Sequence, residues 1–171
     1  YLSNLKRMFG RRILVGFGYI EKNTLFFSKS QSAKKFDSIV CLNVLEHIQE
    51  DLKALENMAK LLKPKGKLFL LVPAHKILFS KFDEELGHFR RYTKDEIEKK
   101  LKRVRLIPQK NFYLNWWAAL GWFFFMKLFR NTNMPRPPVL IFDLLGRLFL
   151  LPEKLIKPPF GLSVFAVAQK K

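Results

Sequence analysis

The residues of this chain best suited to chemistry gather around its three histidines, which are all that its 171 residues contain. His47 and His75 follow predicted strands, and His88 lies in the loop after the second of these strands. Histidine titrates near neutral pH and is the usual proton carrier in enzymes. Taken alone, each is explained more simply as a polar loop residue, because loops carry polar side chains anyway. Their shared placement favours a chemical role.

Two arginines follow His88 and extend this group. Arg90 and Arg91 carry guanidinium groups, which match a carboxylate or phosphate through two parallel hydrogen bonds. Beside His88 they would suit an anionic or hydroxyl-bearing acceptor. The alternative is a solvated or structural role in ion pairs, with Glu84 or Glu85 as partners.

Glu46 stands directly before His47 and has two interpretations. As an acid at the start of a predicted helix it would be favoured by the helix dipole. Otherwise it would support a neighbouring catalytic group. We favour the helix-start role. The histidines lack the spacing of metal ligands, so the sequence predicts no metal site.

A strand, a helix and a second strand must position these residues. Residues 36–42 are an apolar run rich in β-branched side chains, which predicts a strand buried on both faces. Over residues 44–62 the apolar positions recur at helical spacing, with one buried stripe. The segment 63–66, KPKG, ends that helix, because proline cannot continue it and glycine can take a positive φ. Residues 68–72 form a second buried strand that ends at Pro73.

Two parallel strands joined by a helix are the repeating unit of an open α/β sheet. In such sheets, ligands bind beyond the carboxyl ends of the strands. Here those ends carry polar and ionisable side chains, where a purely structural unit would need only turn residues. We therefore expect a site at this edge, formed by Asn43, Glu46, His47 and His75.

These residues resemble class I S-adenosylmethionine-dependent methyltransferases. The similarity lies in NVLEHI after a strand that begins FDSIV, in LLKPKGKLFLLVPAH, in Asp83 with the later run GHFRRY, and in the ending PFGLSVFAVAQKK. It covers residues 36–171 and is closest to a subgroup that acts around lipid or cell-surface glycan pathways. The resemblance implies an α/β fold with a Rossmann-like open, mainly parallel sheet and helices on both faces.

The resemblance also implies an enzyme that transfers a methyl group from S-adenosylmethionine to a small-molecule or lipid-linked acceptor. The donor has a good leaving group, so the protein mainly has to align acceptor, methyl and sulfur and exclude water. An oxygen acceptor also needs a base, for which His47 and His88 are the candidates. We expect Gly16, Gly18, Asn43, Val44 and Leu45 to bind the cofactor, and His75, Arg91, Tyr92 and Trp116 to bind the acceptor.

The first 35 residues depart from the family pattern. There, a first strand leads into a glycine-rich loop. Here residues 11–15 are the predicted strand, and Ile20 replaces a third glycine. A helix with two strands needs about 30 residues, yet fewer than twenty separate Gly18 from Phe36. Two explanations stay open: a segment is missing from the sequence, or the protein is a form truncated in its cofactor-binding half.

Two intensely apolar runs precede the last predicted strand, at residues 116–129 and 138–151. Neither reaches the roughly 18 to 20 uninterrupted apolar residues that span a bilayer. They are either buried core helices or interfacial elements whose aromatic side chains enter the headgroup region. The resemblance implies an apolar helical insertion that takes part in acceptor binding.

The remaining elements complete one predicted domain. Thr93 followed by Glu96 predicts a capped helix start. We expect later strands at 105–113 and 162–168. The domain then divides into a degenerate N-terminal segment (residues 1–35), a core (36–113), the insertion (114–158) and a last-strand segment (159–171).

The charge balance constrains the partners. Thirty-two Lys and Arg against 14 Asp and Glu give a net charge of +18, which attracts phosphate-bearing partners. Because the basic residues are scattered and the aromatics cluster in apolar runs, an anionic membrane surface is favoured over nucleic acid. Cys41, the single cysteine, is expected to be buried and fits a reducing compartment. We expect a cytoplasmic protein, with the inner face of a membrane as a peripheral location.

Two other functions stay open. One is a catalytically inactive methyltransferase-like module that binds a membrane surface or a protein partner, which the damaged N-terminal segment would explain. The other is nucleic-acid binding or methylation, which the positive charge suggests.

Overall fold

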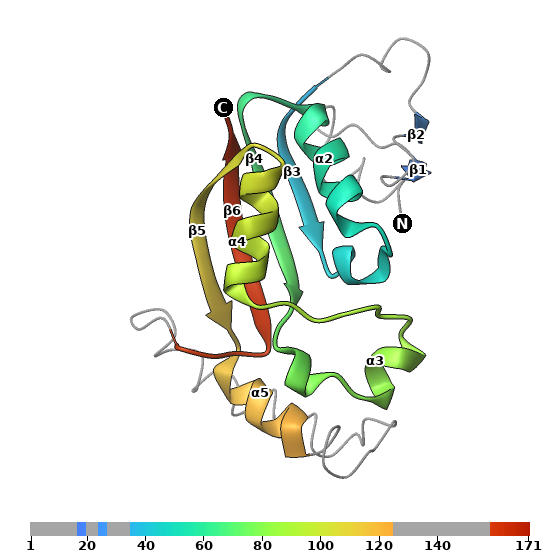
Figure 1. Cartoon of the computed structure of the whole chain (residues 1–171), viewed down its shortest axis with the longest axis vertical. Coiled ribbons are helices and arrows are strands. Elements are labelled where there is room, and N and C mark those ends of the chain that lie inside the picture. The colour runs from blue at the N-terminus through green and yellow to red at the C-terminus, as the bar shows by residue number, and fades with distance from the viewer. Residues whose placement is uncertain (1–16, 20–23, 27–34, 125–157) are drawn as a thin grey trace, which may run out of the picture.

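The structure is a computed structural model that describes residues 17–19, 24–26, 35–124 and 158–171. They form two sheets with helices between the strands (Figure 1). The strands are β1 (Phe17–Tyr19), β2 (Thr24–Phe26), β3 (Phe36–Leu42), β4 (Leu62–Pro73), β5 (Leu106–Leu114) and β6 (Ser163–Lys170). The α-helices are α2 (Asp51–Leu61), α3 (Lys81–Glu85), α4 (Lys94–Arg103) and α5 (Trp116–Trp122), and the 3-10 turns are η3 (Leu45–His47) and η4 (Lys76–Leu78).

The main sheet has four strands in the order β3-β4-β6-β5. β3 and β4 pair in parallel, with Ile39 opposite Leu68, as the strand-helix-strand pattern predicted. β6 is antiparallel to both of its neighbours. β3, β4 and β5 therefore run in the same direction, and their carboxyl ends meet at the lower edge of the sheet in Figure 1.

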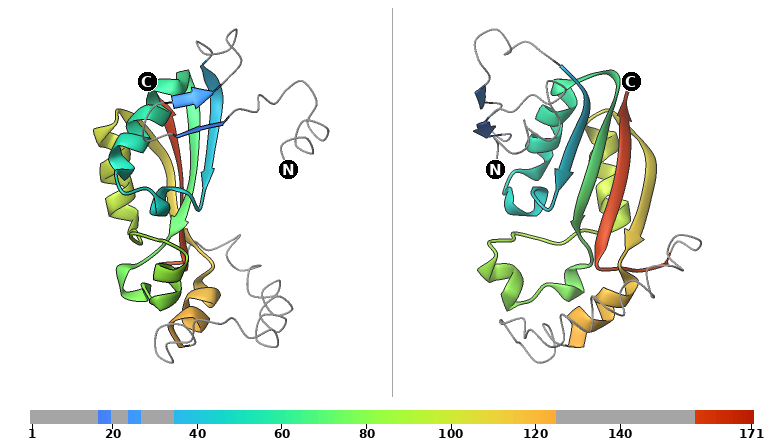
Figure 2. Two further views of the ribbon diagram at one scale, coloured as in Figure 1. Left: turned by 90° about the vertical axis from the view of Figure 1, so that its right-hand side faces the viewer. Right: turned by 180° about the vertical axis from the view of Figure 1, so that it is seen from behind.

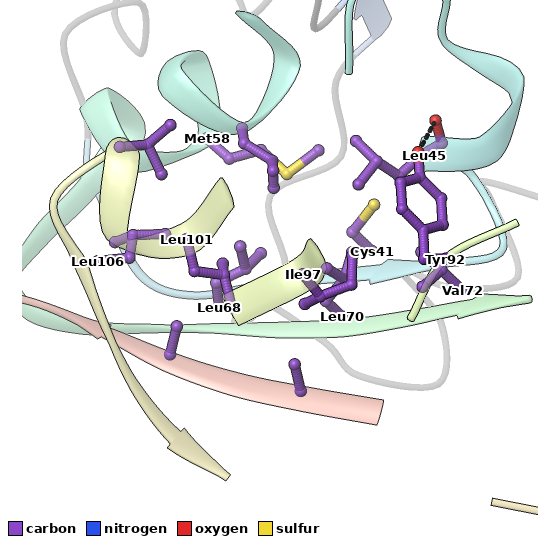
Figure 3. Close-up of a cluster of buried hydrophobic side chains, with 14 of the residues drawn as sticks. Cys41, Leu45, Met58, Leu68, Leu70, Val72, Tyr92, Ile97, Leu101 and Leu106 are labelled. Carbon is purple, nitrogen blue, oxygen red and sulfur yellow. Dashed lines mark hydrogen bonds between the residues drawn. The ribbon is translucent and has the colours of Figure 1, made fainter. Parts of the chain in front are cut away.

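Helices α2 and α4 lie side by side on one face of this sheet (Figure 2). Their apolar stripes and the facing strand residues form the core, a portion of which is shown in Figure 3. Among the described residues no helix covers the opposite face, so the expected two-sided covering is seen on one side only. Burying each large apolar side chain contributes about 1.5–3 kcal/mol, and the wholly buried leucines are Leu45, Leu55, Leu62, Leu68 and Leu101.

β3 is buried less than predicted. Cys41 faces the helices and is 5% exposed, whereas Val40 is 63% and Leu42 is 48% exposed. The prediction of burial on both faces is wrong, because β3 is an edge strand of the described sheet and has one covered face. Burial of Cys41 is confirmed. Desolvation, followed by the charge of Glu46, raises the pKa of its thiol to about 11, so the thiol is unreactive near neutral pH.

The segment after β3 is not the single helix that the sequence predicted. Residues 45–47 form the short turn η3, and Ile48 is extended before α2 begins at Asp51. The carbonyl of Gln49 accepts a hydrogen bond from the Arg90 guanidinium at 2.8 Å. In a continuous helix that carbonyl would accept a hydrogen bond from a backbone N–H of the same helix. Here it accepts the tertiary hydrogen bond from Arg90 instead.

The segment 63–66 belongs to β4 instead of a separate turn. Lys65, not Gly66, takes the positive φ, at 64°. Gly66 is needed for a different reason, because a Cβ there would lie 2.8 Å from the carbonyl oxygen of Lys63. The strand that follows ends at Pro73, as predicted.

β1 and β2 form a separate antiparallel pair in which Gly18 lies opposite Leu25. The predicted strand 11–15 and Gly16 lie outside the described residues. The prediction that Gly18 belongs to the loop after that strand is wrong, because Gly18 lies inside β1. Its expected contact with the cofactor stays a prediction.

The later predicted elements are confirmed. Thr93 caps α4, accepting from the Glu96 N–H at 3.2 Å while the Glu96 carboxylate accepts from the Thr93 N–H at 2.9 Å. β5 and β6 are the last two predicted strands, and α5 lies in the first of the two apolar runs. Residues 125–157 lie outside the described residues, and no described helix is both long enough and apolar enough to cross a bilayer.

Candidate functional site

The carboxyl edge of the sheet has an unusual backbone. β3, β4 and β5 are each followed within two residues by a non-glycine residue with positive φ, namely Asn43 at 50°, His75 at 59° and Asn115 at 59°. Such residues are uncommon and concentrate at functional sites. Tertiary hydrogen bonds hold this conformation, for example from the Asn43 N–H to the Leu71 carbonyl at 2.9 Å.

Glu46, His47 and His88 meet at this edge. The two imidazole rings pack edge to face with their centroids 4.6 Å apart. One ligand-capable atom from each of the three residues lies within 4.8 Å of the others. The loop carrying His88 is tied to η3 by the Phe89 N–H, which donates to the Glu46 carbonyl at 2.9 Å. The structure therefore brings together the two histidines predicted to be catalytic.

Glu46 is wholly buried, and neither of its carboxylate oxygens has a hydrogen-bond partner among the described residues. Burial raises the pKa of this carboxyl, although the positive charges of His88, His47 and Arg91 act against the rise. Burying a polar group without a partner costs free energy. The role of a simple helix-start acid does not explain this position, because such an acid needs no burial.

Asp83 is buried and holds His88 in place, with its Oδ1 2.9 Å from Nδ1 of the ring. Arg91 donates from Nε to Oδ1 at 2.8 Å and from Nη2 to Oδ2 at 3.1 Å. The N–H and hydroxyl of Ser80 also donate to Oδ2, at 2.9 and 3.0 Å. Burial alone would raise the pKa of Asp83, but the hydrogen bonds and charge of Arg91, with His88 and Ser80, outweigh it and lower that pKa.

This arrangement assigns the proton on His88. An ionised carboxylate only accepts hydrogen bonds, so Nδ1 of His88 must carry the proton that it shares with Asp83. In neutral His88 the lone pair then lies on Nε2. That nitrogen can accept a proton or bind a cation.

Arg91 is 2% exposed, and all of its contacts point into the protein. Besides Asp83, it donates to the Ala74 carbonyl at 3.3 Å, and its guanidinium lies 4.5 Å from the centroid of the Trp122 ring. Neither predicted ion-pair partner of the two arginines is used. Arg91 pairs with Asp83, and Arg90 pairs with Asp51. In the structure the Arg91 side chain is surrounded by protein groups, and its expected role in acceptor binding stays a prediction.

Tyr92 is 1% exposed, and its hydroxyl donates to Asp51 at 3.0 Å. The hydroxyl also lies 3.3 Å from the Leu45 carbonyl oxygen, a contact visible in Figure 3. Asp51 accepts a further hydrogen bond from Lys100 at 2.8 Å and pairs with Arg90 at 3.2 Å. Tyr92 therefore connects η3 to the start of α2, and its expected contact with an acceptor stays a prediction.

His75 lies apart from the His47–His88 pair in its contacts. Its backbone N–H donates to the Tyr92 carbonyl at 2.8 Å. Its imidazole ring stacks on the Tyr113 ring, with the two ring centroids 4.5 Å apart. Burial, and then the charge of Arg91, lowers the pKa of His75. Its expected role in acceptor binding stays a prediction.

The predicted cofactor residues after β3 divide into two groups. Asn43 and Val44 are exposed directly beyond the strand, with Val44 44% exposed. Leu45 is wholly buried in the core. The expected contacts of all three residues with a cofactor stay predictions. Trp116, at the first position of α5, packs edge to face against Phe160, with the ring centroids 6.4 Å apart. Its expected role in acceptor binding stays a prediction.

Sequence reasoning assigned no role to Asp83 or Asp51. Asp83 stands five residues before His88, and that loop spacing was the available signal. Asp51 gave no such signal, because its partners Tyr92 and Lys100 are more than 40 residues away.

A family model described as a methyltransferase domain matches residues 10–117, which is more than half of the chain. The match includes η3 and the loop that carries His88, and the sheet geometry agrees with it. The chain belongs to this methyltransferase family.

Solved methyltransferases share the fold. The 1,6-didemethyltoxoflavin-N1-methyltransferase of Burkholderia thailandensis, solved with 1,6-didemethyltoxoflavin and S-adenosylhomocysteine, aligns with a TM-score of 0.54 and 15% identity over 99% of this chain and 56% of its own. A SAM-dependent methyltransferase from Archaeoglobus fulgidus aligns with a TM-score of 0.52 and 15% identity over 99% and 73%. At such identities these structures establish the Rossmann-like open α/β fold alone.

Curated relatives match a shorter stretch. Ubiquinone biosynthesis O-methyltransferases from strains of Coxiella burnetii are 42% identical over 40 residues, which is 23% of this chain. The matched stretch spans 17% of the length of those relatives.

Proposed function

We propose that this protein transfers a methyl group from S-adenosylmethionine to a small-molecule acceptor, with a hydroxyl as the most suitable nucleophile. The observation that carries the proposal is the cluster of Glu46, His47 and His88 at the carboxyl edge of the sheet, in a chain of the methyltransferase family. Ligands of open α/β sheets bind at that edge. The O-methyltransferase relatives and the solved neighbour with S-adenosylhomocysteine support the donor and the acceptor class.

The residues beyond β3 fit a bound donor. Asn43 and Val44 offer an exposed amide and an exposed apolar side chain at the strand end, where the left-handed backbone of Asn43 turns the chain away from the sheet. S-adenosylmethionine, when bound there, supplies an activated methyl group. The contribution of the protein is to align the acceptor and exclude water.

His88 is the residue that we propose as the base. Its Nε2 lone pair can take the acceptor proton, and the imidazolium that forms would be stabilised by the buried carboxylate of Asp83 at Nδ1. This is the orientation that a general base needs. His47, whose ring contacts His88 and is exposed, would position the acceptor.

We further propose that the acceptor is apolar or lipid-linked and is met at an anionic membrane surface. Helix α5 packs beside the η4–α3 segment. The indole N–H of Trp122 donates to the Leu78 carbonyl at 3.0 Å, and the ring centroids of Trp122 and Phe82 lie 5.4 Å apart. Near its end, Phe123 is 37% and Phe124 is 51% exposed. Such an apolar rim next to the site, on a protein with a net charge of +18, suits an apolar acceptor among anionic lipids.

Calorimetry with S-adenosylmethionine tests the donor, and methyl transfer to candidate hydroxyl acceptors tests the reaction. His88→Gln should lower kcat/KM by about 10²–10⁴-fold, the usual contribution of a general base. Asp37→Asn is the control and should change it little, because Asp37 lies in an exposed ion pair with Lys63 at the start of β3, away from the cluster. A folded protein that takes up no S-adenosylmethionine would defeat the proposal and favour the inactive module.

Vesicle flotation tests the membrane proposal. Binding should need anionic lipid and should weaken as salt rises. Generic DNA and RNA in a mobility-shift assay provide the comparison. Tight nucleic-acid binding without vesicle binding would overturn this choice of partner.

A further inference from the structure

We propose that Glu46, His47 and His88 bind one divalent transition-metal cation, for which Zn²⁺ is the best-matched ion. The inference rests on the proposed function only for the use of the cation in methyl transfer, since the binding itself follows from the geometry. The spacing of the histidines in the sequence predicted no metal. The structure changes this conclusion because it brings His47 and His88 together across 41 positions of sequence.

The donor set matches zinc chemistry. Two imidazoles and one carboxylate, with an open fourth position, are the ligands of many catalytic zinc sites. Imidazole suits Zn²⁺ and related ions, whereas Mg²⁺ and Ca²⁺ prefer all-oxygen sites. One ligand atom from each residue already lies within 4.8 Å of the others.

Glu46 gives the second and independent observation. Its side chain is wholly buried, yet both carboxylate oxygens lack a hydrogen-bond partner among the described residues. An unpaired buried carboxylate is costly, and buried charges are normally paired or bound to a metal. The nearby cationic Arg91 is already engaged by Asp83 through two hydrogen bonds. A cation between Glu46 and the two histidines would supply the missing partner.

The surroundings of His88 are those of a metal-bound histidine. Metal-bound histidines usually donate their second ring nitrogen to a carboxylate or carbonyl, which fixes the tautomer and the ring orientation. Asp83 is such a carboxylate, at 2.9 Å from Nδ1, and it is itself fixed by Arg91 and Ser80. Nε2 of His88 is therefore the nitrogen that would bind the cation.

Binding requires only a small contraction of the cluster. Bonds of about 2.0–2.1 Å in a tetrahedral site place ligand atoms about 3.3 Å apart. His47 can supply this movement, because it is exposed and lies beside Gly87, where a Cβ would still be 4.0 Å from His47 Nδ1. Gly87 has a φ of 75° and brings the loop close without a side chain.

A bound cation would change how the acceptor loses its proton. Nε2 of His88 cannot hold a cation and accept a proton at once. With the cation bound, an acceptor hydroxyl in the open position would be more acidic, as zinc-bound water is, and would give its proton to a water molecule. The acceptor oxygen would then bond to the methyl carbon while the bond from that carbon to the sulfonium sulfur breaks, and S-adenosylhomocysteine would leave.

The test is metal binding by the whole protein after treatment with a chelator. Calorimetric titration with ZnCl₂, and metal analysis after gel filtration, should show one bound Zn²⁺ per molecule. His47→Gln and Glu46→Gln should each weaken binding by more than about tenfold, since loss of an outer partner alone costs about 10–100-fold. Co²⁺ in place of Zn²⁺ should give a ligand-field absorption band that disappears in both variants.

His75→Gln is the matched control and should bind Zn²⁺ as the wild type does. His47 is exposed, so its variant is expected to fold even if Glu46→Gln does not. The absence of stoichiometric binding, or equal binding by wild type and His47→Gln, would overturn the site, as would an equal loss in His75→Gln. Binding of S-adenosylmethionine to the chelator-treated protein is measured separately, so failure of the metal site and failure of the proposed function are distinguishable.

Discussion

At the scale of single residues, the loop after β4 is organised by the carboxylate of Asp83. It fixes His88 through Nδ1 and Arg91 through two hydrogen bonds, and all of these contacts are shielded from water. Breaking a buried ion pair by removing one partner leaves an uncompensated charge, which costs far more than the pair itself contributes. The orientation of His88 and the stability of its loop therefore depend on the same carboxylate.

Asp83→Asn should lower the free energy of unfolding by about 3–5 kcal/mol, because it leaves Arg91 buried beside a neutral amide. Urea unfolding followed by circular dichroism measures the change. Asp37→Asn is the matched control, since the Asp37–Lys63 pair is exposed and such pairs contribute little. A loss for Asp83→Asn no larger than for Asp37→Asn would show that the buried pair is not structural.

Asp51 predicts a dependence of stability on pH. Burial alone would raise the pKa of its carboxyl, but hydrogen bonds from Lys100 and Tyr92, and the charges of Lys100 and Arg90, lower it below its ordinary value. A carboxyl whose pKa is lower in the folded state stabilises the protein above its unfolded pKa of about 3.9. That contribution is lost as the pH falls through the folded pKa.

The wild type should therefore exceed Asp51→Asn in unfolding free energy at pH 7, and the difference should shrink as the pH falls below about 4. Urea unfolding at several pH values gives this difference directly. A gap that stayed constant from pH 7 to pH 3 would contradict the pKa assignment.

At the scale of elements, the site is positioned by two short segments that cross the carboxyl edge. η3 carries Glu46 and His47, and the loop after α3 carries His88. The two are joined by the Phe89 N–H to Glu46 carbonyl bond at 2.9 Å. The chain then returns to the sheet through the parallel bridge between Ala74 and Tyr92, directly before α4. The start of α4 consequently anchors one end of the functional loop.

The cap of α4 supplies the test at this scale. Thr93→Ala should cost about 0.5–2 kcal/mol of stability, because the Glu96 N–H loses its acceptor at the first turn. Thr93→Ser keeps the hydroxyl and should retain most of the stability. Chemical denaturation of the three proteins measures the difference, and equal losses in the two variants would rule out the cap as the cause.

At the scale of the whole molecule, several basic residues gather at one edge of the main sheet. A pocket of about 530 Å³ at the edge opposite the site is lined by the acidic Glu56, the apolar Ala59 and Val104, and five basic residues, Lys60, Arg103, Arg105, Lys170 and Lys171. It lies at the carboxyl ends of α2 and α4, where cations are favoured by the helix dipole. Lys170 donates to the carbonyls of Ala59 and Leu62, so some of this charge completes the ends of the fold.

Donor binding should be visible in the stability of the entire fold. A ligand at 100 times its Kd stabilises the native state by about 2.7 kcal/mol. For a protein of this size that corresponds to a rise in Tm of about 5–11 °C. A thermal-shift titration with S-adenosylmethionine measures this, with methionine as the control. A Tm that stays constant up to millimolar donor would contradict the proposed cofactor.

Local sequence pattern was sufficient for the elements whose signals are local. The parallel β3–β4 pair, the capped α4 and the strands β5 and β6 followed from hydrophobic period, turn residues and the capping pair Thr93 and Glu96. Burial of Cys41 followed in the same way. Each of these signals lies within one element. The order of residues in the sequence was therefore enough to predict the elements. The placement of His47 and His88 at the carboxyl edge followed from the strand-helix-strand rule.

The remaining features depend on contacts between distant segments. The pairing of Arg91 with Asp83, the break between η3 and α2, and the burial of Glu46 against His47 and His88 all arise where a loop folds back over the end of β3. Hydrophobic period carries no information about which loop residues meet, because loop paths are set by tertiary hydrogen bonds such as that from Phe89 to Glu46. The sequence therefore showed which single residues could take part in chemistry. Only the tertiary structure decided which of them meet in one site.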